Sequence, residues 1–364
     1  MYKVKVYGAG SIGNHLANAA RHMGWSVDIC DLDSNALKRT KNEIYPQRYG
    51  SWDDEIGLYL PENEPKGIYD MVFIGTPPDS HMELAISAIN EGAKTLLVEK
   101  PVCTPNLNKA QEFYDLVQEK KINAFVGYDH VVADATKIID QRLSEKKYGK
   151  VETLDVEFRE HWGGIFGAHP WLEGPWDTYL GFWEKGGGAA GEHSHAVNLW
   201  QHFANELQLG RVIEVSASLD FVKNNQVSYD KLALFNLKTD KGLLGRVVQD
   251  VVTKPHKKFA RVQTDKGFLE WQCGVKQGTD LAMWSFENQE NQEHFVTKTR
   301  PDDFIAELKH IKSVIESDDL ISPISIERGL DTMLVVAAAH KSALLGKRIN
   351  IDYSKGYTEE ALKF

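Results

Sequence analysis

The feature that most restricts the fold lies at the start of the chain, where a strand pattern, a glycine-rich turn and a helix pattern follow one another. Residues 3–7 alternate and include two valines, and an amphipathic stretch covers residues 14–23. In such a unit the first glycine permits a tight turn, the second admits a pyrophosphate to the backbone, and the third lets helix and strand pack closely. The sequence therefore predicts a dinucleotide-binding unit whose turn contacts the cofactor through Gly8, Gly10, Ser11, Ile12 and Gly13.

A second strand pattern, residues 26–30, ends in Asp31, which lies 23 residues after Gly8. An acid at about this distance accepts hydrogen bonds from the adenine ribose hydroxyls. Its charge would repel a 2′-phosphate, so we predict NAD(H) as the cofactor and regard NADP(H) as the weaker alternative. That Asp31 is only a turn residue stays open as a simpler interpretation.

Strand and helix patterns continue to alternate as far as about residue 145, which indicates a doubly wound parallel sheet. Further strands are predicted at residues 69–74, 93–98 and 123–126, and residues 44–68 are expected to be irregular. Ligands bind at the carboxyl ends of the strands in such sheets. Three residues with functional groups follow strands in this way: Thr76, Lys100 and Tyr128.

Beyond Gly149 strand patterns joined by short turns dominate, and they predict one large, mostly antiparallel sheet. Helices are predicted at residues 301–316 and 326–345, the second ending at Gly346. The predicted fold is therefore α/β, with an N-terminal Rossmann domain and a C-terminal α+β domain. We place the first at residues 1–129 and the second, for substrate binding and oligomerisation, at residues 130–364.

Composition narrows the functional class. The chain has 364 residues and a net charge of −10, which favours two domains and argues against a nucleic-acid partner. Its apolar runs are far shorter than the ~20 residues of a membrane-spanning helix, and the N-terminus lacks a signal-peptide pattern. We therefore expect a cytoplasmic protein without a membrane partner. Its three cysteines are widely spaced and predict neither a disulfide framework nor a metal quartet.

The stretch at residues 186–202 gathers proton-transfer groups. Three glycines precede Glu192, His193 and His195, and a helix pattern follows them. Glycines let the backbone approach a ligand closely. The spacing of the two histidines also suits a metal, but the sequence shows no further ligand set, so we predict no metal site.

Aromatic residues crowd residues 162–183. Such rings provide apolar platforms for the faces of sugars and a cover that excludes water. We predict that Trp162 and Trp176 bind substrate, with helix packing or a subunit contact as the equal alternative.

Several motifs together resemble the Gfo/Idh/MocA family of oxidoreductases. They are the N-terminal GxGxxG, the Gly-Thr-Pro-Pro-x-x-His run at residues 75–81, Glu99-Lys100-Pro101, and the triple glycine followed by an acid and a histidine. The resemblance covers nearly the whole chain. It implies an active-site lysine at Lys100 and cofactor contacts at Thr76, Pro77 and Glu99, to which we add His81 of the same motif.

The family's usual substrate motif, GGGxxxDxxxH, is altered in this chain. Glu192 stands at the position of the acid, and His195 follows it by three residues instead of four. We predict His195 as the catalytic base because a helix pattern continues after it, and His193 stays open as the alternative. Lys100 would hydrogen-bond to the same substrate oxygen, and Glu192 would orient a histidine or bind a hydroxyl. Tyr128 and Asn198 complete the predicted substrate site.

The predicted function is that of an NAD(P)-dependent dehydrogenase or reductase. The resemblance implies hydride transfer at a hydroxyl carbon of a sugar, cyclitol or nucleotide sugar, in a homodimer or homotetramer formed through the C-terminal sheet. Two alternatives stay open. One is an NAD-dependent glycosidase, which would show no net redox change; the other is a non-catalytic sensor that binds dinucleotide.

Overall fold

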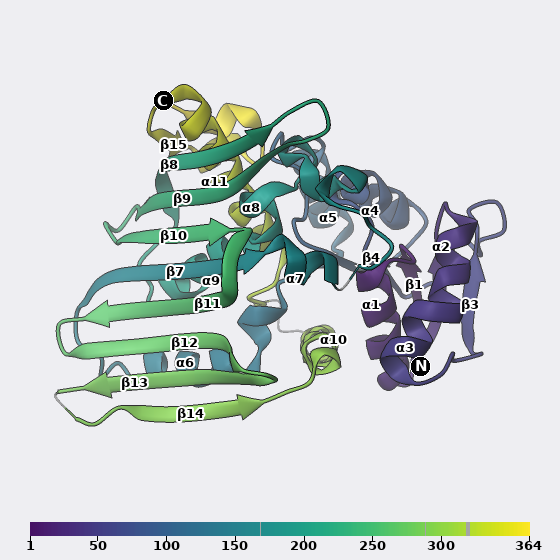
Figure 1. The fold of residues 1–364 in the computed structure, drawn as a ribbon, viewed down its shortest axis with the longest axis horizontal. Helices are drawn as coiled ribbons and strands as arrows, with labels where there is room; N and C mark the ends of the chain where they lie inside the picture. Colours follow the sequence, from purple (N-terminus) through teal and green to yellow (C-terminus); the bar gives the residue numbers. More distant parts are fainter. Residues whose placement is uncertain (168, 288, 318–320) are drawn as a thin grey trace.

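Two β-sheets organise the chain. The computed structural model describes residues 1–167, 169–287, 289–317 and 321–364. The larger sheet has ten strands. In Figure 1 strands of this sheet lie one above another, with the N-terminal sheet and its helices beside them. This arrangement confirms the predicted fold class, a parallel N-terminal sheet followed by a large, mostly antiparallel one.

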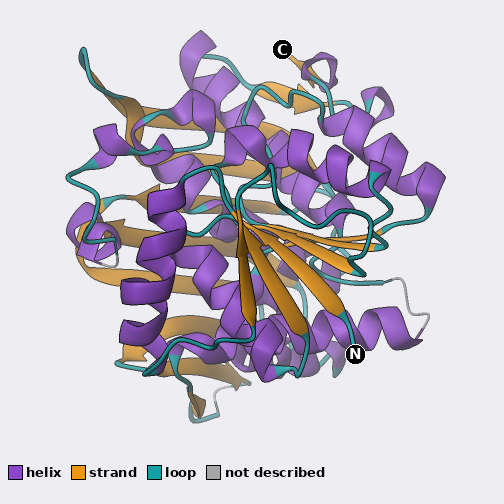
Figure 2. Cartoon of the chain, turned by 90° about the vertical axis from the view of Figure 1, so that its right-hand side faces the viewer, coloured by secondary structure: helices purple, strands orange, loops and turns teal. Residues whose placement is uncertain are grey.

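The N-terminal sheet has six parallel strands in the order β3-β2-β1-β4-β5-β6, which fan out in Figure 2. The sheet order reverses between β1 and β4, and the carboxyl ends of these strands are where such sheets bind ligands. β4 and β5 are buried along their whole length, which explains their uninterrupted apolar sequences. The strands are β1 (Lys3–Tyr7), β2 (Ser26–Cys30), β3 (Ile56–Tyr59), β4 (Met71–Ile74), β5 (Thr95–Val98) and β6 (Asn123–Val126).

Five helices accompany these strands. The first begins directly at the glycine turn, three residues earlier than the sequence pattern indicated. The helices are α1 (Ser11–His22), α2 (Ser34–Arg39), α3 (Tyr45–Tyr49), α4 (His81–Asn90) and α5 (Ala110–Lys120), and a π-helical turn, Thr40–Ile44, joins α2 to α3.

The prediction that residues 44–68 are irregular is wrong. They contain α3 and β3, and β3 pairs with β2 at the edge of the sheet. β3 has four residues and includes Gly57, which weakens its strand pattern in the sequence. A side chain is excluded there because a Cβ on Gly57 would collide with the carboxylate of Asp28 on the neighbouring strand. A contact between strands, invisible in the local sequence, therefore selects the glycine.

The C-terminal sheet has the order β14-β13-β12-β11-β7-β10-β9-β8-β15-β16, and all its neighbours are antiparallel except β7 and β10. β10 ends at Asp250 and β11 begins at Val252, so a single residue separates these two strands. The strands are β7 (Val151–His161), β8 (Val212–Lys223), β9 (Ser228–Thr239), β10 (Leu244–Asp250), β11 (Val252–Thr264), β12 (Gly267–Lys276), β13 (Thr279–Phe286), β14 (Gln292–Thr297), β15 (Ile349–Ile351) and β16 (Leu362–Lys363).

The polar sequence at residues 287–292 predicts an exposed loop, and it falls between β13 and β14. Residue 288 of that prediction lies outside the described residues. Gln292 itself is already the first residue of β14.

Helices cover one face of this large sheet. α6 (Asp134–Ser144), α9 (Ser194–Glu206) and α11 (Ile326–Leu345) pack on it and lie behind the strands in Figure 1. Along β9 the side chains of Ala233, Phe235 and Leu237 are buried, while Leu234 between them is 40% exposed. This alternation leaves the opposite face of the sheet in solvent.

The last two long helices connect the two sheets. α10 (Arg300–Ser317) packs on α1, and the segment before α11 meets the edge of the first sheet, where the Val126 amide donates to the Ile324 carbonyl at 2.8 Å. The predicted domain boundary at residue 129 stays a prediction, since the C-terminal helices contact both sheets. Within the described residues, no helix is both long enough and apolar enough to cross a membrane.

His15 lies at the contact between α1 and α10, where its ring stacks on Phe304 with centroids 4.7 Å apart. The Tyr49 hydroxyl lies 2.6 Å from its Nδ1. Burial, with help from Arg300 and Arg48, lowers the pKa of His15 to about 3. The folded chain therefore keeps this ring neutral, whereas the unfolded chain protonates it below about pH 6.5.

We expect this difference to reduce stability as the pH falls from about 6.5 towards 3. Between pH 6 and 5 the free energy of unfolding should fall less steeply in the His15→Gln variant than in the wild type. The two slopes should differ by about 1 kcal/mol per pH unit. Urea unfolding followed by tryptophan fluorescence would measure this. His294→Gln, at an exposed position, should keep the wild-type slope. Parallel curves for His15→Gln and the wild type would contradict the assignment.

Candidate active site

The glycine turn before α1 fits a dinucleotide. Gly8 has a φ of +102°, and a Cβ there would lie 2.8 Å from the carbonyl oxygen of Gly75. A Cβ on Gly13 would collide with the carbonyl of Gly8, so the helix lies directly against the strand. Around Gly10, by contrast, a Cβ would meet nothing within 4 Å. The open space at the start of α1 suits a pyrophosphate, which amides at a helix N-terminus bind well.

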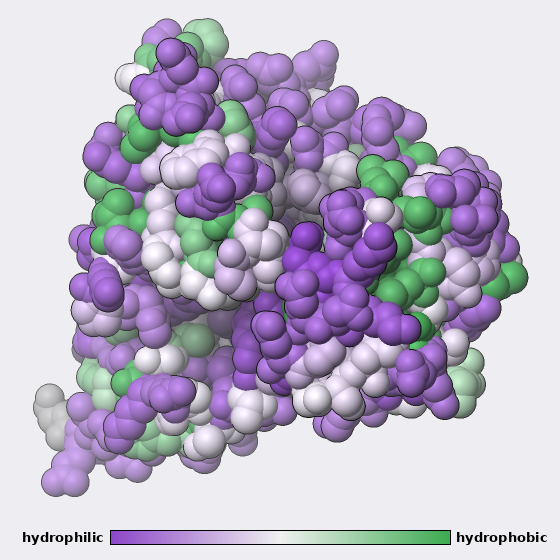
Figure 3. Space-filling view, turned by 45° about the vertical axis from the view of Figure 1, so that its right-hand side comes forward, coloured by the Kyte–Doolittle hydropathy of each residue, from purple (hydrophilic) through white to green (hydrophobic). Residues whose placement is uncertain are grey.

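This open space belongs to a cavity of about 550 Å³, which we call the cofactor groove. One wall comes from the N-terminal sheet and the other from the aromatic segment of the second domain. Figure 3 shows the surface hollowed where these two parts of the chain meet. On the first wall the groove is lined by Gly10, Ser11, Ile12, Gly75, Thr76, Pro77, Asp79, Glu99 and Lys100.

Asp31 lies at the end of β2, as predicted, and its carboxylate is fixed by the backbone. One oxygen accepts from the Ala9 amide at 2.7 Å and the other from the Asp33 amide at 2.8 Å. The first bond ties the carboxylate to the glycine turn. Asp31 is thus oriented beside the glycine turn, and its ribose contact stays a prediction.

The predicted cofactor residues after β4 and β5 divide into two groups. Thr76, Pro77 and Glu99 line the groove. His81 is fully buried, with Nε2 2.7 Å from the Thr76 carbonyl and Nδ1 3.1 Å from the Pro101 carbonyl. His81 therefore links the loop after β4 to the loop after β5 by its contacts with their carbonyl groups, and it does not line the groove.

Lys100 reaches across from β5 to the second domain. Its Nζ lies 3.0 Å from Glu192 Oε1 and donates at 3.0 Å to the Glu192 carbonyl. The Tyr179 hydroxyl donates to the other carboxylate oxygen at 3.3 Å. Burial alone would raise the pKa of Glu192, but the charge of Lys100 and its hydrogen bond to the carboxylate bring the pKa below its usual range. Glu192 is therefore a carboxylate that holds the lysine in place.

Glu99 has a different environment although it precedes Lys100. Its carboxylate is buried and accepts from the Lys100 amide at 3.3 Å. Burial raises its pKa to about 7, with Lys100 opposing the effect and Asp129 adding to it. Glu99 is thus a buried carboxyl group that lines the groove and has a pKa close to neutral pH.

A second cavity of about 760 Å³ adjoins the groove and shares Lys100 and Glu192 with it. We call it the histidine cavity. His193 faces Glu160, with 3.8 Å between Nδ1 and Oε2, and His195 faces Asp129, with 3.8 Å between Nδ1 and Oδ1. Burial lowers the pKa of both rings, and for His195 the neighbouring His130 adds to the effect. Both histidines are therefore neutral near pH 7.

The two histidines point to different partners because the helix breaks between them. α8 (Gly188–Glu192) ends immediately before His193, whose φ and ψ of −95° and 25° are not helical, and α9 begins at Ser194. Glu192 thus ends one helix and His195 lies in the first turn of the next.

Several residues of the histidine cavity escaped the sequence analysis. Each comes from an element other than the glycine-rich stretch: Arg48, Asp129, His130, Glu160, Lys258 and Arg300. Asp129 and His130 follow β6 at its carboxyl end, which was the one signal that could have identified them. Arg48 was missed because residues 44–68 were predicted to be irregular, whereas Arg48 lies in α3. Its guanidinium donates to the Ser11 carbonyl and hydroxyl, each at 2.8 Å.

The four predicted substrate residues lie apart from one another. Trp176 is 45% exposed and lines the cofactor groove. Trp162 packs on Tyr229, with ring centroids 5.5 Å apart, and lines neither cavity. Tyr128 is fully buried behind His195, 5.4 Å away between ring centroids. The geometry supports a substrate contact for Trp176 but not for Trp162 or Tyr128.

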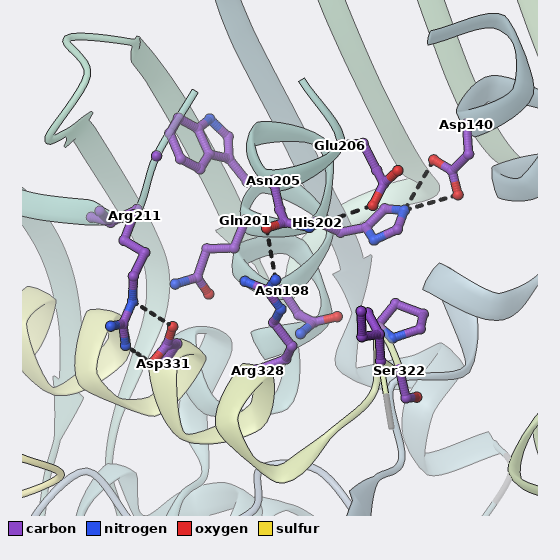
Figure 4. A pocket seen from close by; sticks show the side chains of 15 residues that line it. Asp140, Asn198, Gln201, His202, Asn205, Glu206, Arg211, Ser322, Arg328 and Asp331 are labelled. Carbon is purple, nitrogen blue, oxygen red and sulfur yellow. Dashed lines mark hydrogen bonds and ion pairs between the residues drawn. The ribbon is translucent and has the colours of Figure 1, made fainter. Parts of the chain in front are cut away.

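Asn198 lines a third pocket, of about 230 Å³, together with other residues of α9 (Figure 4). There it donates to Thr332 Oγ1 at 3.2 Å. The surrounding polar groups pair with one another, through Arg211 with Asp331, His202 with Asp140 and Arg328 with Asn205. This pocket contains neither Lys100 nor the glycine turn, and we interpret Asn198 as a structural residue.

A glycine turn that opens onto a groove beside a parallel sheet defines a dinucleotide-binding protein. Residues 2–128 match the family model described as an oxidoreductase family with an NAD-binding Rossmann fold, Gfo/Idh/MocA. Residues 2–128 are therefore similar to the NAD-binding domain of the Gfo/Idh/MocA oxidoreductases, which agrees with the cofactor that the sequence indicated. No curated protein sequence matches the chain.

Solved structures share the fold over almost the whole chain. An oxidoreductase from Agrobacterium radiobacter in complex with NAD+, L-tartaric acid and magnesium is 18% identical, with a TM-score of 0.73 and coverage of 96% of this chain and 98% of that one. Levoglucosan dehydrogenase in complex with NADH and levoglucosan is 17% identical, with a TM-score of 0.76 and the same coverage. The WlbA dehydrogenase from Bordetella pertussis, in complex with NADH and UDP-GlcNAcA, is 18% identical at a TM-score of 0.70, again with 96% and 98% covered.

We expect Asp31→Ser to weaken NADH binding about tenfold, because a hydrogen bond to a charged group contributes about 1.5 kcal/mol or more. The same change should bring the dissociation constants of NADH and NADPH closer together, since it removes the charge that repels a 2′-phosphate. Titration of nicotinamide fluorescence measures both constants.

Asp33→Asn is the matched control for this change. Asp33 caps α2 by accepting from the Asn35 amide at 2.8 Å, and asparagine also caps helices. NADH affinity should therefore stay within about twofold of the wild type. An unchanged ratio of NADH to NADPH affinity in Asp31→Ser would refute the ribose assignment.

Proposed function

We propose that the chain transfers a hydride between NAD(H) and a hydroxyl-bearing carbon of a carbohydrate-like polyol. The observation that carries this proposal is the position of Lys100. It lines the cofactor groove and the histidine cavity at once, so it stands where a nicotinamide and a polyol would meet. A lysine between two adjoining cavities suits contact with the oxygen of the reacting carbon.

When bound, NAD(H) supplies the hydride acceptor or donor. Lys100 holds the substrate oxygen and takes part in its proton transfer, and the Glu192 carboxylate fixes the lysine at 3.0 Å. The aromatic segment that forms the second wall of the groove excludes water. The assignment of His195 as the general base stays a prediction. Its ring borders the same cavity, but its Nδ1 faces Asp129 and not Lys100.

The proposed substrate class rests on the histidine cavity and on the relatives. A cavity of about 760 Å³ with many polar walls accommodates a polyhydroxy compound. Two of the solved structures with this fold hold sugar ligands, levoglucosan in one and UDP-GlcNAcA in the other. These relatives support a carbohydrate-like substrate over an apolar one.

A substrate screen tests the proposal. The purified chain is incubated with NAD+ or NADP+ and panels of sugars, inositols and nucleotide sugars, and the absorbance of the reduced nicotinamide is followed. We expect NADH to form with at least one polyol. Release of an aglycone without net NADH would favour the glycosidase alternative. Dinucleotide binding without turnover of any compound would favour the sensor.

We expect Lys100→Met to lower turnover by about 10²–10⁴-fold, the usual contribution of a group in proton transfer. NADH affinity should change by no more than a few-fold, because the methionine keeps most of the side-chain volume. Steady-state kinetics and fluorescence titration separate the two effects. Lys109→Met removes a surface lysine that pairs with Glu83, and it should leave turnover unchanged. Normal turnover in Lys100→Met would refute the role of the lysine.

We also propose that the chain forms a homodimer or homotetramer through the solvent-facing side of the large sheet. Leu234 and Leu244 lie on strands there and are 40% and 58% exposed. Light scattering coupled to size exclusion measures the mass, and Leu234→Lys should lower it. Leu344→Lys, on α11, should not. A monomeric wild-type chain would contradict the proposal.

A further inference from the structure

Three side chains meet at the floor of the histidine cavity without bonding to one another. Asp129 and His130 come from the 3₁₀ turn Asp129–Val132 after β6, and His195 comes from the first turn of α9. Asp129 Oδ1 lies 3.8 Å from His195 Nδ1 and 3.9 Å from His130 Nδ1. All three atoms lie within 4.8 Å of one another. The distances exceed those of hydrogen bonds.

None of these three atoms has a hydrogen-bond partner, and all are buried. The side chains of Asp129 and His130 are 8% and 6% exposed, and that of His195 is 13% exposed. Their other neighbours include the rings of Tyr128, Phe158 and Trp271, which pack edge-on or stacked around the two imidazoles. Buried polar atoms are almost always satisfied, so three polar atoms without partners at one point call for a missing partner.

We propose that Asp129, His130 and His195 form a site for one divalent transition-metal ion of the Zn²⁺ type. Two imidazole nitrogens and one carboxylate oxygen are ligands that Zn²⁺ binds at about 2.0–2.2 Å. A tetrahedral ion would set the ligand atoms about 3.4 Å apart. The carboxylate oxygen, at 3.8 and 3.9 Å, would have to approach each imidazole by about half an ångström. The ligand atoms of the two imidazoles, which lie within 4.8 Å of each other, would have to approach by up to about 1.4 Å. Three protein ligands leave one position open, as in catalytic zinc sites.

The open position belongs to the histidine cavity. Asp129, His130 and His195 all line that cavity, and so do Lys100 and Glu192. A water molecule or a substrate hydroxyl can therefore occupy the fourth position. The existence of the site does not depend on the proposed function, but a role in turnover does.

Nearby cations do not prevent a metal from binding, because each already has its own carboxylate. Lys258 pairs with Glu160 at 3.3 Å, and Lys298 pairs with Asp280 at 2.8 Å and Asp303 at 2.7 Å. Arg300 is 55% exposed and lies 3.6 Å from Asp303 and 3.9 Å from Asp129 Oδ2. The Oδ1 atom that faces the two imidazoles makes no such contact.

This site changes the expected role of His195. A histidine that binds a metal through Nδ1 keeps its proton on Nε2 and cannot accept another from a substrate. Metal binding and general-base catalysis by His195 are therefore mutually exclusive. The fold brings Asp129 and His130 to His195, and the sequence alone did not show these further ligands. His193, the other histidine of the pair in the sequence, faces Glu160 instead and is not part of the site.

The test uses the tag-free full chain, stripped with a chelator and titrated with Zn²⁺ by calorimetry. We expect one Zn²⁺ per chain, confirmed by elemental analysis after dialysis, and a higher melting temperature in its presence. Asp129→Asn, which keeps the shape of the side chain, and His130→Ala should each weaken binding by at least 100-fold. His193→Ala is the matched control and should bind Zn²⁺ as the wild type does.

Co²⁺ provides a second readout because its visible spectrum reports the ligand set. The wild type should give a tetrahedral Co²⁺ spectrum that His195→Ala removes. A wild-type chain that binds no Zn²⁺, or binding that survives Asp129→Asn and His130→Ala, would overturn the proposal. The Zn²⁺ titration uses no substrate, so its outcome is independent of the substrate screen. A chain that binds Zn²⁺ but oxidises no polyol would contradict the proposed function and support the metal site.

Discussion

The contacts of one lysine join the two halves of the site. Lys100 belongs to the parallel sheet, but its ammonium group lies 3.0 Å from both the carboxylate and the carbonyl oxygen of Glu192 in the other domain. Both groups are mostly buried, so breaking the pair by removing one partner would leave an uncompensated charge. The pair therefore fixes the distance between the cofactor groove and the histidine cavity. The chemistry proposed for the chain requires this distance to be constant.

The position of Glu192 in turn depends on buried polar contacts beneath α8. Asp230 is fully buried and accepts from the Ala190 amide at 2.7 Å, while its other oxygen lies 3.4 Å from His340 Nε2. Gln249 donates to the His193 carbonyl at the end of the same helix. These contacts hold a helix of only five residues, which has little stability of its own. The sheet therefore orients Glu192 through strands β9 and β10.

Local sequence signals predicted where the glycine turn, Asp31 and Lys100 lie, because each follows a strand of the parallel sheet at its carboxyl end. The histidine cavity was harder to predict. Asp129, Glu160 and Lys258 come from three distant parts of the chain, and only the packing of β7, β11 and the turn after β6 brings them together. His195 was identified from its neighbours in sequence, yet its closest charged partner is Asp129, 66 positions away. Long-range partners of this kind leave no periodicity in a single sequence.

The cover of the cofactor groove comes from the second domain and is held at both ends. Trp162 packs on Tyr229 where the aromatic segment begins, and Phe182 pairs with Ser228 where it ends. Between these points Trp171 lies over the guanidinium of Arg39, 5.4 Å away, on the helix that follows Asp31. A segment fixed at both ends and resting on the cofactor domain in the middle forms a wall that keeps water from the reacting carbon. Trp171 and Trp176, which line the groove, are therefore explained by the need to close it, whichever of them touches a substrate.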